Sequence, residues 1–119
     1  MTEILESQQL AQSKCQSCEG GVPPIDPDTA ARQVKKLADW ELSDDGKHIS
    51  RRFDCKSFLG ALDLANRIGD LAEAEGHHPD IHLTGYRHLQ VVLTTHAIKA
   101  LSPNDFILAA KIDQLSTNC

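Results

Sequence analysis

Residues 57–96 have the sequence SFLGALDLANRIGDLAEAEGHHPDIHLTGYRHLQVVLTTH, and this stretch predicts most of the fold. Ser57 is a good N-cap, and an apolar stripe at helical spacing follows it as far as Gly76, a natural helix stop. Pro79 prevents the helix from resuming. Apolar and polar residues then alternate on both sides of Gly85, which is typical of two short strands joined by a turn. The stretch therefore predicts a long helix followed by an antiparallel strand pair.

The flanking segments extend this pattern in both directions. Asp26 and Pro27 are suited to the cap and first position of an earlier helix, which we expect to end near Leu37. Alternation around an Asp-Asp-Gly turn at 44–46 predicts a hairpin. Ser102, followed by a proline, begins the last helix. The resulting order α-β-β-α-β-β-α predicts an α+β two-layer sandwich, with a four-stranded antiparallel sheet and three helices on one face.

Length and composition indicate one soluble domain. With 119 residues the chain has room for a single core. We expect residues 1–25 to be a loosely ordered leader, because they end in Gly-Gly and Pro-Pro breakers, and residues 26–119 to form the domain. The first 26 residues contain no apolar run, and no later segment has the roughly 20 apolar residues of a membrane helix. These features predict a cytoplasmic protein without a membrane segment.

The charge of the chain argues against a nucleic-acid partner. Its formal net charge is −5, and its densest basic spots are pairs of adjacent Lys or Arg residues. Binding to a phosphate backbone relies on clustered basic side chains. We therefore expect no direct binding to nucleic acid.

The cysteines have no clear chemical assignment. Cys15 and Cys18 have the spacing of half a zinc site or of a redox pair, but no second CxxC follows. Without an export signal, a disulfide framework is not expected. The favoured interpretation is that the pair is structurally idle or binds metal only incidentally.

Five of the six histidines lie between positions 77 and 96. His77 and His78 occupy the break after the long helix, and His96 ends the predicted fourth strand. Antiparallel pairing brings the start of one strand beside the end of the next, so these three should meet at one edge of the sheet. Glu73, four residues before His77, can face the same space. The remaining histidine, His48, lies in the first hairpin.

Three imidazoles and a carboxylate in one pocket favour acid–base chemistry. Imidazole titrates near neutral pH, so two histidines in opposite protonation states can act as general acid and general base. Such a pair suits a reaction that protonates a departing hydroxyl while another proton leaves nitrogen. A simpler interpretation is capping or solvation, which we assign to His82 and His88. A zinc site is a further alternative, although adjacent histidines are less natural ligands than an i, i+4 pair.

The segment EAEGHHPD at 73–80, with Tyr86, Thr95-His96 and Asn104-Asp105 downstream, resembles the pterin-4a-carbinolamine dehydratase family over roughly residues 22–116. The resemblance implies dehydration of 4a-hydroxytetrahydropterin to quinonoid dihydropterin, in recycling of the pterin used by aromatic amino-acid hydroxylases. It implies no metal or organic cofactor. One departure is Lys99-Ala100-Leu101, where many members have a glycine before the leucine.

The resemblance also implies roles for individual residues. It assigns catalysis to His77, His78, His96 and Glu73, and the border of the pterin to Pro79, Thr95, Ala97 and Asp105. On the sequence alone, Asp105 is explained by its place three residues after the cap of the last helix. Both interpretations of this residue stay open here.

Partners can also be predicted. A two-layer domain leaves sheet edges uncovered, which predicts a homo-oligomer, a tetramer or a dimer. The partner expected from the resemblance is the pterin itself. A competing hypothesis is an interaction protein, because animal relatives act as dimerisation cofactors and some relatives act in assembly. A zinc-dependent hydrolase is the third hypothesis.

Overall fold

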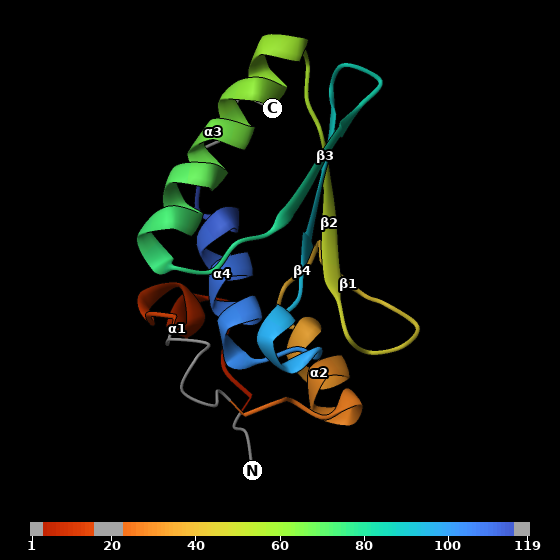
Figure 1. Ribbon diagram of the computed structural model, residues 1–119, viewed down its shortest axis with the longest axis vertical. Helices are drawn as coiled ribbons and strands as arrows, with labels where there is room; N and C mark the ends of the chain where they lie inside the picture. Colours follow the sequence, from red (N-terminus) through yellow and green to blue (C-terminus); the bar gives the residue numbers. More distant parts are fainter. Residues whose placement is uncertain (1–3, 16–22, 116–119) are drawn as a thin grey trace.

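The computed structural model describes residues 4–15 and 23–115, and its core is one open antiparallel sheet with helices on one side (Figure 1). The strands are β1 (Glu41–Leu42), β2 (Ile49–Asp54), β3 (Asp80–Thr84) and β4 (His88–Leu93), in the order β1-β2-β4-β3. The helices are α1 (Ser7–Gln12), α2 (Pro27–Val34), α3 (Phe58–Glu75) and α4 (Pro103–Asp113), with a short 3-10 helix, η2, at His96–Ile98. The α+β prediction is confirmed, and α1 is an additional helix that the sequence did not predict.

The predicted helix ends depend on local caps, which the structure contains. The Asp26 carboxylate accepts a hydrogen bond from Thr29 N at 2.8 Å, and the Ser57 hydroxyl accepts one from Gly60 N at 3.0 Å. Gly76 ends α3 with φ 68°, a left-handed conformation that glycine adopts without steric cost. The end of α3 is thereby placed directly before the two adjacent histidines.

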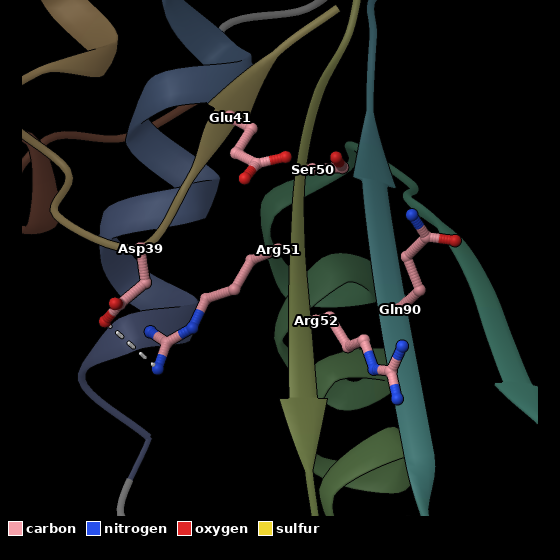
Figure 2. A pocket seen from close by; sticks show the side chains of 6 residues that line it. All are labelled: Asp39, Glu41, Ser50, Arg51, Arg52 and Gln90. Carbon is pink, nitrogen blue, oxygen red and sulfur yellow. Dashed lines mark ion pairs between the residues drawn. The ribbon is translucent and has the colours of Figure 1, made fainter. Parts of the chain in front are cut away.

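Strand alternation separates a buried sheet face from an open one. In the β2–β4 register Ile49 pairs with Leu93 and Phe53 with Leu89, and all four side chains are buried beneath the helices. The opposite face is polar. Figure 2 shows the residues that line a pocket beside β2 and β4: Asp39, Glu41, Ser50, Arg51, Arg52 and Gln90. The pocket has a volume of about 450 Å³, and of its lining residues Arg51 points to the helix side, where it bonds Asp113 of α4.

The leader, which we expected to be loosely ordered, contributes to the core in its described part. Helix α1 packs against α4, and Leu10 is only 2% exposed. The buried Gln33 side chain receives the Leu5 N–H at 2.9 Å and donates to the Leu5 carbonyl at 2.8 Å. These two bonds hold the leader against α2. Within the described residues, no helix is long and apolar enough to cross a membrane.

Leu10→Ala is expected to destabilise the protein by about 2 kcal/mol, the lower end for a buried leucine, because a short helix can partly collapse into the cavity. Gln8→Ala, on the exposed face of the same helix, should cost less than about 0.5 kcal/mol. Urea denaturation monitored by circular dichroism measures both. Equal effects of the two substitutions would show that α1 is not part of the cooperative core.

Candidate functional site

His77 is the most constrained of the clustered histidines. It follows the Gly76 cap of α3, is 4% exposed, and its Nε2 lies 2.6 Å from Oδ1 of the fully buried Asp105. The other carboxylate oxygen of Asp105 accepts hydrogen bonds from Thr95 Oγ1 at 2.8 Å and from Ser102 N at 2.9 Å. Asp105 therefore caps α4 and fixes the His77 ring at the same time.

His78 points to a different environment. Its Nε2 lies 2.7 Å from Glu73 Oε1, and the two side chains are 62% and 80% exposed. We expected Glu73 to face the same space as His77, but in the structure its carboxylate contacts His78 instead. Glu73 can hold the His78 ring, but an exposed pair of this kind stabilises the fold by little.

His96 lies on a loop and not at the end of a strand. Strand β4 ends at Leu93, and Thr95 then bridges to Ala100 through an N–H···O bond of 3.0 Å. His96 begins η2, the short helix inside this loop, and Lys99 closes it in a left-handed conformation at φ 52°. The strand thus ends three residues before the predicted end, because its last pair joins Leu93 to Ile49, the first residue of β2.

The three histidines line one cavity of about 210 Å³, the histidine cavity, whose lining residues are Gly76, His77, His78, Thr94, His96 and Ala97. Of the predicted border residues, only Ala97 lines it. Thr95 and Asp105 lie behind His77, fully buried. Thr94 was not predicted, and its hydroxyl donates to the Lys47 carbonyl at 2.6 Å. Alternation along β4 could have indicated a contact at this position, although not its partner.

Sequence comparison assigns the chain that forms this cavity to a protein family. Residues 23–115 match the profile described as pterin 4 alpha carbinolamine dehydratase. The chain belongs to this family. A protein of Halorhodospira halophila, provisionally named for this activity, is 45% identical over 106 residues, covering 89% of this chain and 96% of its own length. Pterin-4-alpha-carbinolamine dehydratase 2, mitochondrial, of Arabidopsis thaliana is 40% identical and covers 89% of this chain and 58% of its own length.

A solved structure shares the fold of this chain. A transcriptional coactivator/pterin dehydratase from Brucella melitensis superposes with a TM-score of 0.71 at 24% identity, covering 76% of this chain and 96% of that one. At such identity the likeness shows the fold alone. The resemblance stated from the residues is thus confirmed for the family, whose members are hydro-lyases.

Among the described residues, no group of three or more His, Cys, Asp or Glu side chains is placed to hold a metal ion. The adjacent His77 and His78 point to different carboxylates, on Asp105 and Glu73. Each of the two imidazole rings is therefore held by its own carboxylate.

Cys15 and Cys55, the two cysteines among the described residues, do not line the histidine cavity. Cys55 is buried and disulfide-bonded, so the expectation of a chain without disulfides was wrong, whereas Cys15 is a free thiol. Cys15 N donates to Glu75 Oε1 at 3.0 Å, which joins the leader to the end of α3. Its predicted neighbour in the CxxC motif, Cys18, lies outside the described residues. Burial, followed by the nearby Glu75 carboxylate, raises the pKa of the Cys15 thiol to about 12.

Cys15 is therefore expected to react with iodoacetamide at pH 8.5 at least about a hundredfold more slowly than glutathione, because the thiolate is the nucleophile. Glu75→Gln should accelerate the reaction, since it removes a negative charge beside the sulfur. Peptide mass spectrometry over time measures both rates. Alkylation of Cys15 at the glutathione rate would contradict the position of this thiol.

Proposed function

We propose that this chain dehydrates a 4a-hydroxytetrahydropterin to quinonoid dihydropterin and water, in recycling of the pterin used by aromatic amino-acid hydroxylases. The observation that carries the proposal is the single cavity lined by His77, His78 and His96, with His77 held by the buried Asp105. The family match over residues 23–115 supports the reaction class and one dehydratase domain over 26–119.

In this reaction the C4a–O bond breaks and the hydroxyl leaves with an added proton as water. The N5 proton is lost, and its electron pair forms the new C4a=N5 bond. One group must therefore donate a proton and another must accept one, which two imidazoles near neutral pH can do. His78 and His96 are exposed enough to exchange protons with solvent. His77 offers a ring of fixed orientation.

The other site residues are proposed to act around these three. Glu73 holds the His78 ring, and Asp105 holds the His77 ring from behind. Thr95 in turn donates its hydroxyl to Asp105. Ala97 borders the substrate, as it lines the cavity. Pro79 is proposed at the border as well, on the family resemblance alone.

A turnover assay on 4a-hydroxytetrahydropterin tests the proposal. We expect dehydration well above the spontaneous rate, unchanged by exhaustive chelation, because the proton transfers are assigned to imidazoles. Absence of acceleration would contradict the proposed activity. Loss of activity on chelation, restored by zinc, would favour the metal-dependent alternative.

The competing proposal is an interaction protein. A pterin dehydratase-like protein with a related fold, at 20% identity and a TM-score of 0.53, is described as a RuBisCO assembly factor in the alpha-carboxysome. At this identity the comparison carries the fold only. Three histidines gathered in one cavity favour the enzyme, because binding alone does not need them.

We also propose a homo-oligomer, a dimer or tetramer, located in the cytoplasm. The sheet has edge strands at β1 and β3, and two large apolar side chains at the start of α3 are exposed, Leu59 at 76% and Phe58 at 48%. Open edges and exposed apolar patches favour association. Light scattering at micromolar concentration should give a multiple of the chain mass; a monomer would contradict the proposal. Cell fractionation tests the location.

A further inference from the structure

A second cavity of about 200 Å³ adjoins the histidine cavity. Its lining residues are Lys47, His48, Thr94, His96 and Lys99. Thr94 and His96 line both cavities, so a molecule bound beside His96 in one is next to the opening of the other. We call the second one the cationic cavity.

The charge of this cavity differs from that of the chain. Its lining has two ammonium groups, two imidazoles and no carboxylate, whereas the whole chain has a net charge of −5. Among the described residues, neither Lys47 nor Lys99 has an ion-pair partner within 4.0 Å. A local excess of positive charge next to a substrate site attracts anionic groups.

One acidic residue, Asp45, lies beside the cavity lining, and its carboxylate is engaged in the neighbouring turn. Asp45 Oδ1 accepts hydrogen bonds from Ser43 Oγ at 2.6 Å and from Lys47 N at 3.0 Å, inside the turn between β1 and β2. The same oxygen lies 3.8 Å from His48 Nδ1. Asp45 thus shapes the turn and partly balances His48, but it does not line the cavity.

The backbone holds both lysines in place. The Lys47 carbonyl accepts the Thr94 hydroxyl at 2.6 Å, which ties the β1–β2 turn to the end of β4. Lys99 closes η2 at φ 52°, where a residue with a Cβ is strained and glycine is not. A strained lysine on the rim of a cavity points to a role for its side chain.

We propose that the cationic cavity binds an anionic group, a carboxylate or a phosphate, on the side chain of the pterin substrate. The inference rests on the proposed function for the position of the pterin ring. It goes beyond that function because it names the substrate class: pterins with a negatively charged side chain are preferred over neutral ones. Lys47 and Lys99 are then specificity determinants, and they take no part in proton transfer.

Binding of stable oxidised pterins tests this without turnover. The probes are 6-methylpterin, 6-carboxypterin and the phosphate ester of 6-hydroxymethylpterin, with dissociation constants measured by quenching of pterin fluorescence. We expect at least one anionic probe to bind about tenfold more tightly than 6-methylpterin, as two charge-assisted contacts would give. The carboxylate and phosphate arms identify which anion the cavity favours.

The variant Lys47→Gln/Lys99→Gln should bring the anionic probes to within about twofold of 6-methylpterin and leave the affinity for 6-methylpterin unchanged. Lys35→Gln/Lys56→Gln is the matched control, because it removes the same charge from exposed lysines outside both cavities. The single variants Lys47→Gln and Lys99→Gln should each show part of the effect. In turnover, the double variant should raise KM for an anionic substrate without changing kcat.

Two results would overturn the inference. One is equal binding of anionic and neutral pterins by the unaltered protein; the other is an equal loss of preference in the control variant. If the protein still dehydrates a neutral substrate in either case, only the cationic cavity fails and the proposed function stands. Binding of no pterin at all would overturn both.

Discussion

His77→Ala and His96→Ala are each expected to lower turnover of 4a-hydroxytetrahydropterin by about 10²–10⁴, the usual effect of losing a positioned acid or base. Both side chains line the histidine cavity. His82→Ala is the control, because His82 is exposed on β3, pairs with Gln90 across the strands and lines neither cavity. It should change turnover by less than about twofold.

The buried position of His77 requires a second variant there. His77→Ala leaves the Asp105 carboxylate without this partner, so the protein also loses stability. His77→Gln retains a donor toward Asp105, and we expect it to recover much of the stability and none of the turnover. Turnover is measured per folded molecule, with the folded fraction taken from circular dichroism. If His82 were as sensitive as His96, or if His77→Gln were fully active, the proposed catalytic group would be wrong.

Asp105→Ala is expected to destabilise the protein by about 3–5 kcal/mol, the cost of breaking a buried pair, and to lower turnover per folded molecule by at least about tenfold. Asp105 is fully buried and its two oxygens hold His77, Thr95 and the first turn of α4. Without it the His77 ring has lost the carboxylate that orients it. Asp105→Asn should show smaller losses of both kinds, because the amide keeps one acceptor.

Ser102→Ala separates capping from orientation. Ser102 also caps α4, through a bond from Asn104 N at 3.2 Å, and its hydroxyl lies 2.7 Å from Thr95 Oγ1. It does not contact His77 in the described hydrogen bonds. Losing a cap costs on the order of 1 kcal/mol, so stability should fall while turnover per folded molecule stays near wild type. Urea denaturation and single-turnover kinetics measure the two quantities. If Asp105→Asn behaved in the same way, Asp105 would be only a cap and would leave the proposed site.

The secondary structure of this protein is determined by short-range signals in its sequence. The caps at Asp26, Ser57 and Ser102 and the stop at Gly76 each depend on residues no more than a few positions apart. Alternation likewise predicts the buried residues of β2 and β4, although not those of β3, which is exposed along most of its length. The four-stranded antiparallel sheet and its main helices could therefore be predicted, as could the meeting of His77, His78 and His96, because antiparallel register follows from short connections.

The sequence could not determine which side chains contact one another in the site. Asp105 contacts His77 across 28 residues, while Glu73 turns to His78, and both outcomes depend on how α3 and α4 approach one another. The burial of Leu10 depends equally on an apolar surface of α4 that the leader alone does not reveal.

The two lysines of the cationic cavity also meet only through the tertiary structure. Lys47 and Lys99 are far apart in the chain, and a hydrogen bond from Thr94 to the Lys47 carbonyl brings their segments together. The sequence by itself determined where helices and strands begin and end, because those signals act over one or two turns of chain. Only the tertiary structure decided which charged and polar groups meet, because burial gives long-range contacts their energy and depends on the packing of the whole core.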